Sequence, residues 1–430
     1  MSSSLLIISG WFLLISTFFS IFNGFFPSIL LSISGILSAI AAMILFQKLS
    51  GIQRLQVFLL TTTGFLLILT SDENIPFLIN KALTANSALI ALLISVGFLK
   101  LIIKAGDEKE ALPTGNKALW KTMFGLQYFA AVINLSAIVL FGDRIKHKNT
   151  LHKEQFIILS RNFSAASYWS PFFAAMGVAL LYSGGADFNI LFSIGVCVSA
   201  CGLLITGLQC SQIVKKEQRE FKGYPMHINS LFLPIILSAQ VLIGHKIFPE
   251  VSTLILVACI VLITVVVKLI FEHSIPKAFS TIKKHVENGI TNSASELLLF
   301  LSAGILAVGI NALISSMDYK LPIDQFTGVY ASLTMIGTVL LALIGIHPVI
   351  SISIIGSLLV PLLTDPNLLG MMFLFSWGAG VIANPLSGIS LVLQSRYNIT
   401  GFNLIRINAT YIMVMLMLCS GVLILYDYLH

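Results

Sequence analysis

Charged residues are scarce in this chain of 430 residues, where Lys, Arg, Asp and Glu together make up 10%. A soluble globular chain carries about 25%. Apolar residues account for 57%. The shortage of charge excludes a soluble enzyme, a nucleic-acid-binding protein and a disordered protein. The net charge of +7 does not indicate a nucleic acid partner, because the basic residues lie in short segments between apolar runs.

Several motifs of enzymes and channels are also missing. The chain has no Walker-A loop, no His-Glu-x-x-His, no Gly-x-Ser-x-Gly and no Thr-Val-Gly-Tyr-Gly run. Its five cysteines are odd in number and lack metal-ligand spacing. No Lys or Arg precedes the first apolar run, so we expect no cleaved signal peptide. We expect no enzyme activity, no metal site and no cofactor.

Long apolar runs fill most of the sequence. A membrane-spanning helix needs about 20 mostly apolar residues, so the composition allows about twelve spans. Unbroken apolar runs are typical of helices, whereas β-barrel strands alternate in polarity. The sequence therefore predicts an all-α polytopic protein of the lipid bilayer, in the cytoplasmic (inner) membrane. The longest polar connection, 272–295, is predicted to hold a surface helix.

Basic residues predict the topology. Twenty of the 25 fall into five clusters, at 48–54, 100–121, 144–161, 215–222 and 268–284. The positive-inside rule places all five on the cytoplasmic side. This is possible only if 124–142 and 328–364 each enter and leave the membrane on the same side. We therefore expect about 11 transmembrane helices plus two re-entrant hairpins, with the loop 144–155 and the N-terminus cytoplasmic and the C-terminus external.

An internal similarity appears after each expected hairpin. Residues 165–172 align with 379–386 at an offset of 214, which places Pro171 on Pro385 and Ser170 on Asn384. Two interpretations are open, namely chance likeness between apolar segments and two inverted repeats. Paired broken helices in two halves are typical of a transporter binding site. The expected divisions are 1–110 as N-terminal scaffold or dimerisation helices, 111–210 as the first repeat core, 211–285 as connecting scaffold helices, and 286–430 as the second repeat core.

The two proline breaks are the main candidates for binding. A break frees backbone carbonyls that can hold Na⁺ and presents half-helix N-termini that suit an anion. For each break, a structural kink is the alternative. We expect the breaks and hairpins to form one site, in which Ser170 and Asn384 approach each other across a pseudo-two-fold axis. The expected substrate-binding residues are Ser170, Pro171, Asn384, Pro385, Ser387, Gly388, Asn134, Ser136 and His347.

Two ionisable residues carry further hypotheses. His347 is the only histidine well inside an apolar run, and histidine titrates near neutral pH. It is expected either to carry a coupling proton, with Asn384 and Ser170 as the other coupling-ion candidates, or to cap a turn. Arg161 precedes the first break. It is expected either to attract an anion or to anchor its helix at the cytoplasmic face.

The architecture resembles the ion transporter superfamily, which includes divalent-anion/sodium symporters and arsenite-efflux carriers. The resemblance rests on the spans, the hairpins and the two breaks, which read Trp-Ser-Pro at 169–171 and Asn-Pro-Leu-Ser-Gly at 384–388. Neither break carries the Ser-Asn-Thr signature of the dicarboxylate branch. The resemblance implies elevator-like alternating access and often a homodimer.

The expected function is a secondary active transporter that moves a small organic or inorganic anion, coupled to H⁺ or Na⁺. An integral membrane enzyme and a non-transporting assembly subunit stay open as alternatives.

Overall fold

The computed structural model describes residues 3–103, 110–146, 150–226, 232–316, 325–360 and 365–430. All named regular elements in these ranges are helices, so the predicted all-α class is confirmed. Nine helical stretches of the described chain are long and apolar enough to cross a membrane. The chain is a polytopic helical membrane protein, and it divides into two compact units.

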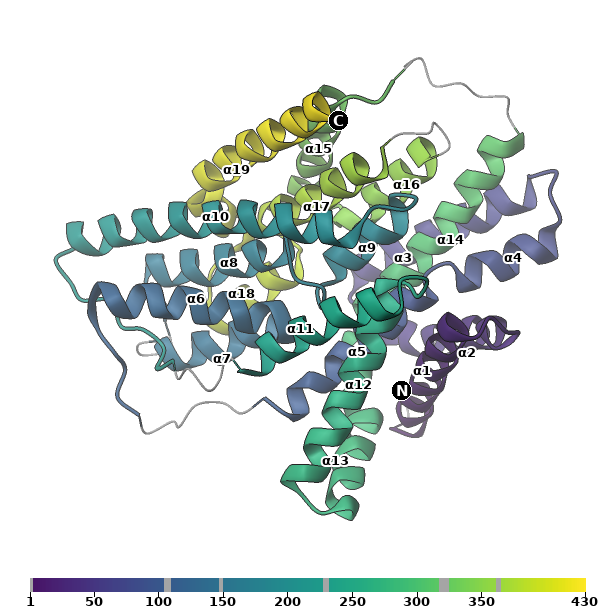
Figure 1. The fold of residues 1–430 in the computed structure, drawn as a ribbon, viewed down its shortest axis with the longest axis horizontal. Helices are drawn as coiled ribbons and strands as arrows, with labels where there is room; N and C mark the ends of the chain where they lie inside the picture. Colours follow the sequence, from purple (N-terminus) through teal and green to yellow (C-terminus); the bar gives the residue numbers. More distant parts are fainter. Residues whose placement is uncertain (1–2, 104–109, 147–149, 227–231, 317–324, 361–364) are drawn as a thin grey trace. The chain divides into compact units, whose positions relative to one another are not determined.

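Unit 1 comprises 1–103, 237–324 and 353–362. Its helices, purple and green in Figure 1, are α1 (Ser3–Phe25), α2 (Leu30–Leu45), α3 (Gly51–Leu69), α4 (Ile75–Thr84), α5 (Ser87–Gly97), most of α11 (Phe232–Ile247), α12 (Thr253–Glu272), α13 (Ile275–Asn288) and α14 (Ala294–Ser316), with short 3₁₀ turns at Phe46–Lys48, Phe98–Leu101 and Ile290–Ser293.

Small residues hold the helices of unit 1 together. Helices α3 and α14 cross so closely that a Cβ added to Gly309 would lie 2.5 Å from the carbonyl oxygen of Gly64. Between α1 and α2, the hydroxyl of Ser16 lies 2.9 Å from that of Ser34 and 2.7 Å from that of Ser38. Close backbone approach and buried hydroxyl contacts are the usual means of packing helices in a bilayer.

The boundaries of unit 1 differ from the expected domains. Helix α14 was expected in the second repeat core at 286–430, but it packs along α3 in unit 1. The predicted surface helix is present as α13, which buries Ala278 and Val286 and leaves Lys277, Lys283 and Lys284 exposed.

Unit 2 comprises 104–236, 325–352 and 363–430 and is built from two sets of five helices. The first set is α6 (Gly115–Ile133), α7 (Leu135–Ile145), α8 (Lys153–Ser167), α9 (Ala174–Tyr182) and α10 (Phe188–Lys216). The second is α15 (Gly328–Leu343), the start of α16 (Pro348–Leu359), α17 (Pro366–Ala383), α18 (Gly388–Tyr397) and α19 (Gly401–Leu429). Each helix of the second set begins 213 or 214 residues after its counterpart. The repeat therefore extends over five helices, well beyond the similarity at the prolines.

The two sets run in opposite directions. At one end of unit 2, Thr114 pairs with Lys222 and Arg219 forms a 2.5 Å ion pair with Glu154, which brings together the starts of α6 and α8 and the end of α10. At the other end, the backbone N–H of Asp187 donates to Asn367, and that of Gly328 donates to Asp427. Asn189 and Tyr426 line one groove there. The first set starts at the first end and the second set at the other, so the repeat is inverted.

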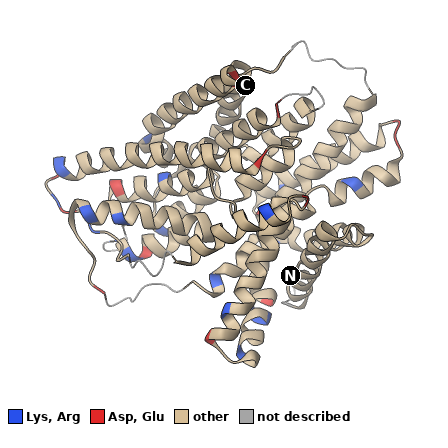
Figure 2. Cartoon of the chain, in the orientation of Figure 1, with Lys and Arg blue, Asp and Glu red and all other residues tan. Residues whose placement is uncertain are grey.

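Charge differs between these two ends. Lys and Arg gather where α10 finishes and α6 begins (Figure 2), and we call this the basic end. The opposite end carries Asp187, Asp365 and Asp427. Unit 1 has a basic end of its own, where Lys48 donates to the Thr291 carbonyl and Lys268 donates to that of Ile102.

Both expected hairpins are present as helix pairs. Helices α6 and α7 meet at the single residue Asn134, and Gln155 at the start of α8 donates to the carbonyl of Ile145 at the end of α7. The pair thus begins and finishes at the basic end of unit 2. In the second pair, α15 and α16 meet at the turn 344–347. Residues 147–149 of the expected cytoplasmic loop lie outside the described residues.

We predict that the two ends of unit 2 lie on opposite sides of the membrane. In a chain whose five native cysteines are replaced by serine, Lys153→Cys should react with an impermeant maleimide only from the cytoplasm. Asn189→Cys, equally exposed at the other end, should react only from outside. Labelling of both cysteines from the same side would contradict the hairpin topology.

Candidate functional site

The first break lies between α8 and α9, at 168–173. Ser170 is fully buried there, and its hydroxyl donates to the carbonyl of Ala131, near the end of α6. The same hydroxyl accepts a 3.1 Å hydrogen bond from the N–H of Phe172. The residue before the proline therefore ties the broken helix to the hairpin.

The second break, between α17 and α18, is built in the same way. The buried amide of Asn384 donates to the carbonyl of Ile346 in the second hairpin turn at 3.0 Å, and its oxygen accepts from the N–H of Leu386 at 2.7 Å. Ala131 and Ile346 occupy neighbouring positions of the repeat, and Phe172 and Leu386 occupy the same one. Both breaks are thus satisfied by one arrangement, which chance similarity of sequence does not explain.

The half-helices that follow the breaks begin differently. Ser387 caps α18, because its hydroxyl accepts a 3.3 Å hydrogen bond from the N–H of Ser390. Helix α9 starts after Phe173, which offers no side-chain cap. Uncapped N–H groups at a helix N-terminus are available to an anion, and the helix dipole favours negative charge there. Gly388 begins α18 and packs against Leu135 at the start of α7.

Asn134 forms the tip of the first hairpin. Its φ of 49° lies in the left-handed region, which asparagine tolerates better than most residues. Its amide N–H donates to the carbonyl of Phe172 at 3.4 Å, whereas its buried Oδ1 has no hydrogen-bond partner in the structure. The tip therefore contacts the first break and also presents a free acceptor. Ser136 is half-buried in the first turn of α7, and Gly345 supplies the left-handed residue of the second turn with φ 95°.

His347 is half-buried at the start of α16. Its Nδ1 accepts a 3.3 Å hydrogen bond from the N–H of Val349, and its ring packs edge-on against Trp377 with 5.2 Å between ring centres. The contact with Val349 requires an unprotonated Nδ1. This geometry is that of the turn cap, one of the two roles expected for His347.

The two broken helices cross before their breaks. The hydroxyl of Ser164 on α8 donates to the carbonyl of Gly378 on α17 at 2.7 Å, and these residues are equivalent in the repeat. Gly378 also faces the ring of Tyr168, and Gly370 faces Leu191, so α17 runs antiparallel to the first broken helix. Each break therefore lies on its own side of the crossing. This corrects the expected meeting of Ser170 and Asn384, because the pseudo-two-fold axis passes between Ser164 and Gly378.

Other polar residues of α8 were not singled out from the sequence. Asn162 is fully buried and donates to the carbonyl of Met123 on α6 at 3.1 Å, but its Oδ1 has no partner in the structure. Its repeat equivalent, Ser376, is also buried with an unpartnered hydroxyl. Seven polar residues within the fifteen of α8 were the available signal: Glu154, Gln155, Ser160, Arg161, Asn162, Ser164 and Ser167.

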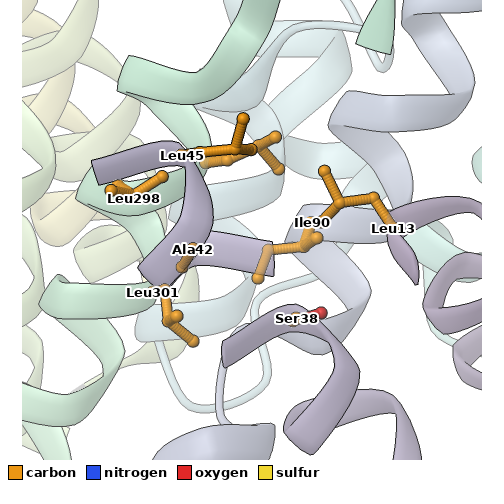
Figure 3. Close-up of a pocket in the computed structure, with 8 residues that line it drawn as sticks. Leu13, Ser38, Ala42, Leu45, Ile90, Leu298 and Leu301 are labelled. Atoms are coloured by element: carbon orange, nitrogen blue, oxygen red, sulfur yellow. The ribbon is translucent and has the colours of Figure 1, made fainter. Parts of the chain in front are cut away.

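Two cavities lie away from the breaks. In unit 1, a space of about 10 Å³ is enclosed by apolar side chains of α1, α2, α5 and α14 (Figure 3), which is room for about one water molecule. In unit 2, a groove of about 560 Å³ runs between α10 and α19 at the end opposite the basic one. The smaller space cannot hold an organic substrate.

Comparisons with known proteins give a match of fold. No family model matches the chain, and no curated protein matches it in sequence. Among solved structures, it is similar to the YdaH transporter of Alcanivorax borkumensis, with a TM-score of 0.57 and 13% sequence identity. The match covers 87% of this chain and 97% of that one. At this identity the likeness shows a shared fold, and that fold is one used by a membrane transporter.

We predict that both pre-proline contacts stabilise unit 2. Ser170→Ala and Asn384→Ala each remove a donor from a buried hairpin carbonyl, so each should lower the free energy of unfolding by about 1–3 kcal/mol. Thermal unfolding in detergent would measure this. Ser395→Ala is the matched control, since that exposed hydroxyl bonds only within its own helix. A Ser170→Ala or Asn384→Ala variant as stable as the control would contradict the assigned role.

Proposed function

We propose that the chain is a secondary active transporter of the cytoplasmic membrane that moves a small anion by alternating access. The observation that carries the proposal is the mirrored construction of the two breaks, in which each pre-proline residue ties a broken helix to its own hairpin. Inverted repeats with paired broken helices are typical of secondary transporters. The fold shared with a transporter supports the same class. We extend the proposal to membership of the ion transporter superfamily.

We place the anion at the first break. There the N-terminus of α9 has no side-chain cap, and the hairpin tip at Asn134 lies within hydrogen-bond reach of Phe172. The second break contributes Asn384, Pro385, Ser387 and Gly388 on the other side of the α8–α17 crossing. Orientation follows from charge: the basic ends are cytoplasmic, the N-terminus is inside and the C-terminus is outside.

Two routes of coupling are open to this architecture. The unpartnered Oδ1 atoms of Asn134 and Asn162, with the carbonyls freed at the breaks, are oxygen ligands of the kind that hold Na⁺. His347 is the candidate proton carrier, at the cost of its contact with the N–H of Val349. We propose coupling to one of these two ions.

Uptake into proteoliposomes tests the function. Purified chain would be reconstituted and assayed with radiolabelled lactate, succinate, citrate, sulfate and phosphate, under separate H⁺ and Na⁺ gradients. Accumulation above protein-free vesicles, driven by one gradient, is the expected result. No gradient-driven accumulation of any of the five anions would count against the proposal and favour the enzyme or assembly-subunit alternatives.

His347→Gln separates the coupling routes. The glutamine amide oxygen can accept from the N–H of Val349, so the fold should be retained. If His347 carries the proton, uptake by this variant should lose most of its pH dependence between about pH 5 and 8. An unchanged pH profile, with uptake that still requires Na⁺, would assign His347 to the turn and coupling to the oxygen ligands. His285→Gln, in unit 1, is the control histidine substitution.

A further inference from the structure

Arg161 is the largest fully buried polar side chain of the described residues, with 0% of its surface exposed. Its Nε donates to Asn408 at 2.8 Å, and its two terminal nitrogens donate to Gln209 at 2.6 Å and to the carbonyl of Ile407 at 3.1 Å. The guanidinium also lies 4.6 Å from the ring centre of Tyr411. The end-anchor interpretation is therefore wrong for this residue, because its charge is enclosed by α8, α10 and α19.

These partners of Arg161 are neutral. Among the described residues, no carboxylate oxygen lies within 4 Å of the guanidinium. Asn408 is held in place by donating to Ser160 and to the Leu404 carbonyl, which leaves its oxygen facing Arg161. The cluster satisfies hydrogen bonds but does not cancel the charge, so a net positive charge is buried in unit 2.

The depth of this charge follows from the helices that hold it. Arg161 lies eight residues into α8, Gln209 seven residues before the end of α10, and Asn408 seven residues into α19. At 1.5 Å per residue, each is about 10–12 Å from the basic end. An ionisable group inside the membrane is costly and is a functional candidate by default.

The repeat shows that the fold does not require the charge. The positions 214 residues away from Arg161, Gln209 and Asn408 hold Phe375, Leu423 and Ile194, all apolar. The same helices therefore pack in the second set without any buried cation. Replacing buried polar groups by apolar ones is often neutral or stabilising, so packing alone does not account for Arg161.

We propose that Arg161 determines the charge of the transported ion, an inference that rests on the proposed function. Ser170 lies nine residues farther along the chain, about 13 Å at helical rise. A fixed positive charge at that distance, in a medium of effective dielectric constant about 20, strengthens binding of an anion at the break by about tenfold per unit of its charge. It weakens binding of a cation by the same factor. Arg161 thus acts at a distance as a specificity-determining residue.

Charge can be removed from this cluster in two ways. Arg161→Gln deletes the cation, and Asn408→Asp places a carboxylate against it. Both should raise the KM for a monovalent anion such as lactate about tenfold, and that for divalent sulfate or succinate about a hundredfold. Arg161→Lys keeps the charge and should leave KM within about threefold. Asn408→Ser is the matched control, because it removes the same amide as Asn408→Asp without adding charge.

The valence dependence separates an electrostatic role from a structural one. Damage to the fold lowers the maximal rate for all anions alike, whereas loss of charge raises KM more for the divalent ones. If only one anion of the panel is carried, the comparison of Asn408→Asp with Asn408→Ser decides, and it also decides if Arg161→Gln fails to fold. Equal KM values in those two variants would overturn the proposal. Absence of uptake by the unmodified chain would instead overturn the proposed function.

Discussion

A broken helix inside a membrane leaves backbone carbonyls and N–H groups that no water can satisfy, and unit 2 depends on how these groups find partners. Ser170 and Asn384 supply the same solution twice. Each joins an N–H two residues ahead in its own chain to a carbonyl of the preceding hairpin. Removing either side chain leaves polar groups in an apolar interior. The hairpin and the broken helix of each repeat are therefore bound to behave as one piece.

This constraint explains why much of the architecture could be predicted from sequence. Proline breaks are local signals, and Pro171 and Pro385 mark two of them at one offset. Hydropathy gives the spans because a bilayer demands long apolar helices. The basic clusters then identified both hairpins, since only a returning pair of helices keeps them on one side. Asn134 and Gly345, the residues with left-handed φ, are of types that tolerate a turn.

Packing partners were beyond the sequence. Gly378 is one of many glycines in apolar runs, and nothing local shows that it faces Ser164 and Tyr168. Helix α14 was assigned to the wrong unit because its apolar residues carry no information about which helix they contact. Arg161 was read as an anchor because it follows a basic cluster. Its depth in the fold is set by α10 and α19, which lie some fifty and 250 residues away along the chain.

The differences between the two repeats are as informative as their shared framework. Both have a pre-proline contact, a hairpin turn and a half-helix, which are the parts that a stable break requires. The first alone has the buried cation; the second has Phe375 in its place. The first has an uncapped half-helix, where Ser387 caps the second. It also has two amide oxygens, on Asn134 and Asn162, that lack partners.

Features that the fold can omit in one repeat are not needed for folding in the other, so their concentration in the first repeat has a chemical reason. A positive charge and free N–H groups attract an anion, and free oxygens attract its accompanying cation. The second repeat, capped and apolar, supplies the symmetry-related surface against which the first works. An inverted repeat can thus keep a symmetric framework for movement while placing most of its binding chemistry on one side.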